Sequence, residues 1–160
     1  MSQPDPKAPV SDPAAPSEER RRWMAVLARA GGEAIRAHLA DAAPLPPHTR
    51  LRGPETGLVM LRGRAGGDGA AFNLSEMTVT RCSVSLPCGA VGHAYIAGRD
   101  QAQAELAAVL DAALQDPARR PSLMAAVIAP LAAAQAALDK AEARKAAATR
   151  VQFFTMATMR

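Results

Sequence analysis

The clearest pattern of apolar and polar positions lies in the middle of the chain, where residues 77–86 alternate in character. Alternation with a period of two is typical of a β-strand, because successive side chains point to opposite faces of a sheet. A Pro-Cys-Gly turn follows, and residues 91–97 predict a strand that returns antiparallel to the first. Apolar runs at 57–64 and 69–74 predict two more. We therefore expect an antiparallel sheet of about four strands within residues 50–98.

Helical periodicity precedes this sheet. Trp23 and Leu27 mark the apolar stripe of one helix, a Gly-Gly pair interrupts it, and Ile35 and Leu39 mark the stripe of a second helix. The pattern predicts a helical hairpin over residues 18–43, with the preceding serine at position 17 as its N-cap.

Helical periodicity also follows the sheet, over residues 100–150. Asp100 and Gln103 predict a capping box at the start of one helix. A final long helix is expected from Pro121 or the next residue past Ala147, with a kink at Pro130 because proline cannot donate a backbone hydrogen bond. The predicted fold is therefore α+β, with an N-terminal helical hairpin, the sheet, and two C-terminal helices of which the last is long.

The 160 residues have room for one domain. Residues 1–17 are rich in proline, alanine and aspartate and predict a disordered leader, so the single domain is expected over residues 18–160. Residues 151–160 contain Phe153, Phe154 and Met156, side chains that are typical of interface anchors. We expect this tail to dock on a partner protein; the alternative is that it folds back onto its own sheet.

Polar and ionisable side chains interrupt the predicted central strands. Alternation places Arg81 and Ser83 on one side of their strand, and antiparallel pairing that keeps register parity brings His93 and Tyr95 to the same face. Polar groups within a sheet often mark a place where a ligand or partner binds. The alternative is an ordinary solvated face, and a one-residue bulge would separate the group.

Composition and charge narrow the possibilities. Apolar residues make up 49% of the chain but aromatic residues only 3%, and much of the apolar content is alanine. Such a core buries little area, which suggests that a partner chain supplies part of the stability. The net charge of +4 is concentrated at the two ends of the chain. Basic ends suit nucleic acid, an acidic protein surface or a polyanionic ligand such as a triphosphate.

Several classes of site are not expected. Cys82 and Cys88 lack the spacing of a zinc site, so we expect no metal and predict free thiols in a reducing compartment. The AGGDG run lacks the lysine and hydroxyl residue of a phosphate-binding loop. No signal-peptide pattern is evident, and no uninterrupted apolar run approaches the roughly 20 residues of a membrane span. We therefore expect a cytoplasmic protein.

Four segments carry a resemblance to a known family: LRGPETGLVMLRGRAGG, NLSEMTVTRCSVSL, GHAYIAGRD and KAAATRVQFFTM. In the order and spacing of these segments, the chain from Glu18 onward resembles the PhnG subunit of the bacterial carbon-phosphorus lyase system. It departs from the family pattern at Ser75, where a glycine is expected before the glutamate, and in its Pro/Ala-rich leader.

The resemblance implies a part in phosphonate breakdown. PhnG acts with PhnI, PhnH and PhnL to displace adenine from ATP by a phosphonate, which gives a ribose 1-phosphonate 5-triphosphate, and PhnJ later breaks the carbon-phosphorus bond. The nucleoside-cleaving chemistry is attributed mainly to PhnI. The resemblance thus implies a transferase subunit that is inactive alone and binds no cofactor itself. ATP and a phosphonate are then substrates of the complex, and the partners are PhnI above all, with PhnH, PhnJ and PhnL.

The implied displacement at the anomeric carbon needs charge stabilisation, cationic clamps and a proton donor. As catalytic candidates we assign Glu76 to stabilise the developing cation, Arg81 to hold phosphate oxygens and His93 to donate a proton. As further substrate-binding candidates we assign three arginines on or beside the sheet, because guanidinium groups bind phosphate bidentately. These are Arg62, Arg64 and Arg99. Each candidate is also compatible with a structural ion pair or hydrogen bond.

A second hypothesis comes from the helical hairpin, whose outline also fits a DNA-binding helix-turn-helix. The second helix offers only Arg36 and His38 as groove-reading side chains, beside Glu33 and Asp41. A plain αα-hairpin is therefore favoured, and nucleic acid is not expected as a partner. A nucleic-acid-binding or regulatory protein remains the alternative, and it would show salt-sensitive DNA binding.

Overall fold

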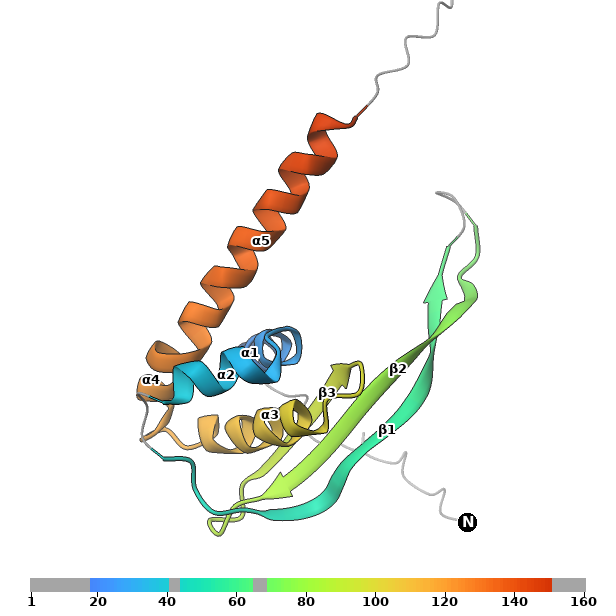
Figure 1. Cartoon of the computed structure of the whole chain (residues 1–160). Coiled ribbons are helices and arrows are strands. Elements are labelled where there is room, and N and C mark those ends of the chain that lie inside the picture. Colours follow the sequence, from blue (N-terminus) through green and yellow to red (C-terminus); the bar gives the residue numbers. More distant parts are fainter. Residues whose placement is uncertain (1–17, 41–43, 65–68, 151–160) are drawn as a thin grey trace, which may run out of the picture.

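The structure is a computed structural model, and it describes residues 18–40, 44–64 and 69–150. The predicted leader, the Ser17 cap and the C-terminal docking tail lie outside the described residues. The elements in chain order are α1 (Glu18–Arg29), α2 (Gly32–Leu39), β1 (Thr49–Gly63), β2 (Phe72–Ser85), β3 (Val91–Ala97), α3 (Gln101–Leu114), α4 (Arg120–Leu123), the π-helical turn η1 (Met124–Ile128) and α5 (Ala129–Ala148). The predicted α+β class is confirmed: two helices precede the antiparallel sheet in the sequence and the remaining helices, with the long last one, follow it (Figure 1).

The sheet has three strands in the order β1-β2-β3, all antiparallel, and not the four expected. The two runs predicted as separate strands at 69–74 and 77–86 form the single strand β2. Their junction is a bulge and not a turn, because the pairing passes from Leu61 with Ser75 to Arg62 with Asn73. β1 also begins earlier than predicted, at Thr49.

Helix α3 forms the middle layer, between the sheet and the α1–α2 pair (Figure 1). Most of its residues are buried, and many of these are alanines. Small side chains let β3 approach α3 closely, and Gly92 is the tightest point. A Cβ atom there would lie 2.6 Å from the backbone nitrogen of Ala112 and would overlap the backbone oxygen of Ala108. The thin core expected from the composition is thus compensated by close approach of helix and strand.

The predicted capping box at the start of α3 forms only in part. The side chain of Asp100 accepts a hydrogen bond from the backbone N–H of Gln103 at 2.8 Å, as predicted. The Gln103 amide does not return to the cap. It is buried and donates to the backbone oxygens of Leu27 and Ala28 at 3.1 and 3.2 Å. Gln103 therefore satisfies carbonyl groups near the end of α1 and joins α1 to α3.

The C-terminal elements α4, η1 and α5 form one continuous helix, Arg120–Ala148. The kink expected at Pro130 stays a prediction. The π-helical turn η1 ends two residues before this proline, whose ring leaves the carbonyl four residues back without a donor. By length and composition this helix is apolar enough to cross a membrane, contrary to the absence of a span predicted above. One such helix is weak evidence of a span: Leu123, Val127 and Leu131 at its start pack in the core, while 22% of its apolar window is buried.

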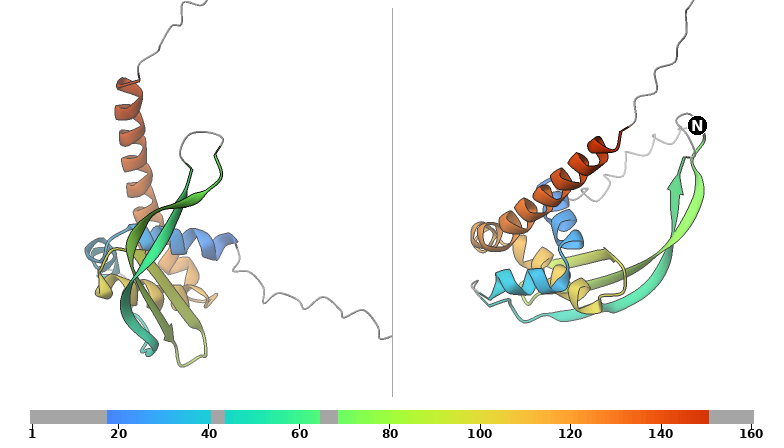
Figure 2. Two further views of the ribbon diagram at one scale, coloured as in Figure 1. Left: turned by 90° about the vertical axis from the view of Figure 1, so that its right-hand side faces the viewer. Right: turned by 45° about the horizontal axis from the view of Figure 1, so that its top comes forward.

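The outer parts of the molecule are two extensions. Because β3 ends at Ala97, opposite Val79, residues 72–78 of β2 have only β1 as a ladder neighbour. We call this two-stranded ribbon, residues 58–63 with 72–78, the arm, and the remainder of the sheet with α1, α2 and α3 the body. The arm and α5 extend from the body toward the same side of the molecule without lying against each other (Figures 1 and 2).

Candidate functional site

The structure confirms the predicted group of polar side chains on one face of the sheet, where all three strands pair. We call this group, which consists of Arg81, Ser83, His93 and Tyr95, the polar face. Arg81 pairs with Tyr95 and Ser83 with His93, without a bulge between β2 and β3. The Ser83 hydroxyl lies 2.9 Å from Nδ1 of His93. The opposite side of both strands is buried against α3, through residues such as Cys82. The assumption that register parity is kept across the turn is therefore confirmed.

Arg81 belongs to a charge network on this face. Its Nε donates to Oε1 of Glu55 at 2.5 Å, and Arg52 forms an ion pair with the same carboxylate. The hydrogen bond from Arg81, followed by that from Arg52, lowers the pKa of the Glu55 carboxyl. One carboxylate is shared by two guanidinium groups, so the network keeps a net positive charge. It can still bind an anion through the guanidinium N–H groups that Glu55 does not use.

The other predicted site residues are not brought together with Arg81 and His93. Arg62 lies in the arm, opposite Asn73, and donates to the backbone oxygen of Ala71 at 3.3 Å. Asn73 is eight residues from Arg81 along β2, or roughly 25 Å at the usual rise of a strand. Arg62 and Arg81 therefore cannot grip one phosphate group within a single chain.

Three more candidates are equally dispersed. Glu76 pairs with Met60 in the arm, and its parity places it on the side of β2 opposite to Arg81. Arg64 is exposed just after the end of β1, and Arg99 is exposed in the turn between β3 and α3. The partner-binding candidates Phe153, Phe154 and Met156 lie outside the described residues.

A buried carboxylate, Asp111 of α3, was not predicted. It is fully buried and accepts hydrogen bonds from Arg20 at 2.7 and 3.0 Å, from the indole of Trp23 at 2.9 Å and from the backbone N–H of His93 at 2.9 Å. Arg20 also donates to the backbone oxygen of Val91. Asp111 thereby ties α1 and the edge strand β3 to α3, and it fixes the backbone that carries His93. A lone aspartate inside the apolar stripe of α3 was the available signal.

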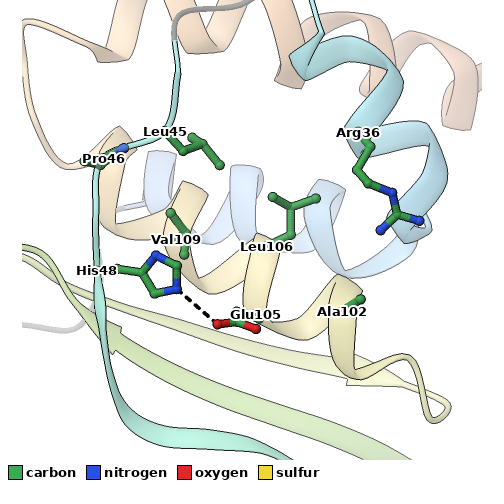
Figure 3. A pocket seen from close by; sticks show the side chains of 8 residues that line it. All are labelled: Arg36, Leu45, Pro46, His48, Ala102, Glu105, Leu106 and Val109. Carbon is green, nitrogen blue, oxygen red and sulfur yellow. Dashed lines mark hydrogen bonds and ion pairs between the residues drawn. The ribbon is translucent and has the colours of Figure 1, made fainter.

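A pocket of about 360 Å³ lies between α2, the segment that leads into β1, and α3 (Figure 3). Its lining residues are Arg36, Leu45, Pro46, His48, Ala102, Glu105, Leu106 and Val109. Glu105 accepts from Nε and a terminal nitrogen of Arg50 at 2.6 and 2.8 Å, and lies 3.0 Å from Nε2 of His48. The Arg50 hydrogen bond, then that of His48, lowers the pKa of the Glu105 carboxyl.

On the side of this pocket away from His48, Arg36 extends from α2 (Figure 3). Among the described residues it forms no ion pair. Arg36 and the apolar side chains Leu45, Leu106 and Val109 of this pocket suit a ligand that joins an anionic group to an apolar ring. The sequence did not predict this pocket, because its residues come from three separate elements.

The two cysteines have different surroundings. Cys82 is buried, donates to the backbone oxygen of Arg52 at 3.4 Å, and has its thiol pKa raised by burial. Cys88 is exposed. Within the part of the chain that the structure describes, no group of three or more histidine, cysteine or acidic side chains is arranged to hold a metal ion.

Comparison with known proteins identifies the family. The family model for "Phosphonate metabolism protein PhnG" matches residues 18–158. Over 140 residues the chain is 49% identical to the alpha-D-ribose 1-methylphosphonate 5-triphosphate synthase subunit PhnG of Rhizobium meliloti (strain 1021), a match that covers 86% of this chain and 88% of the relative. This extent of similarity, over the two helices, the sheet and the long C-terminal helix, shows that the chain belongs to the PhnG family of phosphonate metabolism proteins.

Proposed function

We propose that this chain supplies part of a shared active site and does not form a complete one by itself. As a PhnG protein it is a subunit of alpha-D-ribose 1-methylphosphonate 5-triphosphate synthase and acts in phosphonate metabolism. The observation that carries the proposal is the separation of its candidate groups. Arg81 lies on the polar face of the body, whereas Arg62 and Glu76 lie along the arm. Other subunits must therefore complete the site.

The reaction that we assign to the complex is displacement of adenine from ATP by a phosphonate. A phosphonate oxygen attacks C1′ of the ribose while the bond from C1′ to the adenine nitrogen breaks, and adenine leaves with a proton. The product is a ribose 1-phosphonate 5-triphosphate. The partners proposed for this step are PhnI, PhnH and PhnL, with PhnJ in the same assembly. This chain binds no cofactor of its own, and the complex works in the cytoplasm.

In such a shared active site, the polar face is the part of this chain best suited to bind substrate. The two guanidinium groups beside Glu55 carry surplus positive charge, and they are held by neighbouring strands. Preorganised cations stabilise the charge of phosphate or phosphonate oxygens without rearranging during the reaction. Arg81 is therefore proposed as a clamp. His93, oriented through Ser83 on the same face, is proposed as a proton donor.

The structure offers nothing in favour of a helix-turn-helix function. α2 is an eight-residue helix, its Ile35 is buried in the core, and its Arg36 lines the pocket described above. A recognition helix has to present a longer basic surface to the major groove. We therefore do not propose nucleic acid as a ligand.

The proposal is tested with Arg81→Ala in a synthase assembled from all its subunits. Conversion of ATP and methylphosphonate should fall about 100-fold, the usual effect of removing one transition-state donor, while the subunits still co-purify. Arg21→Ala is the matched control. Arg21 is an exposed arginine of α1 that forms a long ion pair with Glu18, at 3.6 Å, and it lies outside the polar face. Loss of assembly would assign Arg81 to an interface, and full activity would reject the clamp. Turnover by the isolated chain would overturn the shared site.

A further inference from the structure

The arm carries an unusual share of the large apolar side chains that the structure leaves exposed. Leu58 is 65% exposed, Met60 53%, Leu61 38%, Phe72 45% and Leu74 60%. No helix of the body covers this ribbon (Figures 1 and 2). Monomeric proteins rarely expose contiguous apolar surface of this kind, and a two-stranded ribbon alone is only marginally stable in water. The arm therefore requires a cover, and the described residues of this chain do not provide one.

Apolar side chains occupy both faces of the arm. On one face, Leu58 and Met60 follow Thr56, which contacts Thr80 on the side that α3 covers in the body. On the other face lie Leu61 and, opposite Gly63, Phe72. A flat partner surface could cover only one of these faces.

The free edge of β1 is also protected unequally. In the body, β1 is interrupted by two register shifts and contains Pro54 and two arginines that form ion pairs, features that prevent pairing with another strand. In the arm, residues 58–61 read LVML, without proline, charge or register shift. That part of the edge offers its backbone groups to an added strand.

We propose that the arm inserts into an apolar cleft of another subunit of the synthase, which covers both faces and the free edge, and whose rim carries carboxylates. This inference rests on the proposed function, because it takes the partner from the same assembly. Arg62 and Arg64, at the outer end of β1, form no ion pair among the described residues, and carboxylates on the partner complement their charge. A second copy of this chain is a poorer occupant, because edge-to-edge pairing of two β1 strands leaves both faces exposed.

The test is co-expression of the full chain with the other synthase subunits, one of them tagged, and measurement of how much of this chain co-purifies. Leu58→Glu should reduce recovery at least about tenfold, as expected at the centre of an apolar interface. Leu51→Glu is the matched control: Leu51 lies on the same strand and is 59% exposed, but belongs to the body. Phe72→Glu, on the other face, should act like Leu58→Glu. Circular dichroism of the isolated variants should match the wild type.

Recovery of Leu58→Glu and Phe72→Glu at wild-type levels would overturn the arm as an interface. Equal losses with Leu51→Glu would also overturn it, because the effect would not be confined to the arm. An isolated wild-type chain that is a dimer, converted to monomer by Leu58→Glu, would make a second copy the occupant. Failure of the wild-type chain to join any subunit would reject the proposed function itself, and this inference with it.

Discussion

Helix α3 and the arm use apolar residues in opposite ways. α3 is built largely from alanine, and those of its alanines that face the sheet or α1 are buried. The arm contains leucine, methionine and phenylalanine, and these lie mostly in the open. In an ordinary globular domain the largest apolar side chains are those withdrawn from water. Here the interior does bury large side chains such as Trp23, Leu27 and Ile35, and α3 adds alanines that permit close approach, whereas the large apolar side chains of the arm stay exposed and are available for contact with another protein.

The body compensates for its small side chains with buried polar contacts. Asp111 receives donors from α1 and β3, and Gln103 binds carbonyl groups at the end of α1. Such contacts specify one arrangement of the elements, because an unsatisfied buried polar group is costly. Among the described residues, the arm makes no comparable contacts with the body, so its orientation there depends on the β1–β2 ladder. If this comparison holds, body and arm substitutions should have separable effects.

The largest expected effect follows from removing the central carboxylate of the body. Asp111→Ala removes the carboxylate that pairs with Arg20 and accepts from the Trp23 indole. It should lower the free energy of unfolding by about 3 to 5 kcal/mol, measured by urea denaturation. The matched control is Asp139→Ala, which removes an exposed carboxylate that also accepts from an arginine, Arg29 at 2.6 Å. It should change stability little. Equal midpoints for the two variants would show that Asp111 does not hold the body together.

The second effect concerns the contact between β3 and α3. Gly92→Ala forces a Cβ atom into the backbone of Ala108 and should cost about 1 to 3 kcal/mol or more, seen as a lower midpoint in urea. Gly57→Ala, at the junction with the arm, meets nothing within 4 Å and should be tolerated. Destabilisation by Gly57→Ala as large as that by Gly92→Ala would mean that body and arm are packed alike.

The smallest effect is a pH dependence at the start of β1. Because Arg50 and His48 lower the pKa of Glu105 in the folded state, its contribution to stability is present above the unfolded value, about 4.3. That contribution is lost as the pH falls through the lower folded pKa. Glu105→Gln should therefore flatten the loss of stability below about pH 5, measured by thermal unfolding at several pH values. Glu33→Gln, an exposed position without an ion pair among the described residues, is the control. Parallel pH profiles for wild type and Glu105→Gln would contradict the role of Glu105.

Local patterns in the sequence predicted the α+β class, most of the elements and the polar face correctly. Alternation in β2 and β3 fixes which side chains share a face, so Arg81, Ser83, His93 and Tyr95 could be grouped before the structure was known. The fourth strand was wrong, because a bulge next to Ser75 carries the chain on in the same direction where a turn was expected. Bulge and turn have similar local signatures, and only pairing with β1 distinguishes them.

Contacts between distant segments could not be predicted in the same way. The donors to Asp111 from α1 lie 91 and 88 positions away along the chain, and the pocket at Glu105 combines α2, the connector and α3. An aspartate in an apolar stripe signals a buried partner but does not identify it. The dispersal of Arg62 and Glu76 along the arm likewise depends on the length of β1 and β2 beyond β3, which no short motif encodes.

Completion of the arm by another subunit is the central proposal for this protein. Hydrogen exchange of the isolated chain and of the assembled synthase measures this directly, peptide by peptide. In the isolated chain, amides of the arm at residues 58–63 and 72–78 should exchange far faster than those of α3. On assembly the arm should slow by at least about tenfold while α3 stays unchanged. An arm as protected as α3 in the isolated chain, or unchanged by assembly, would contradict the claim.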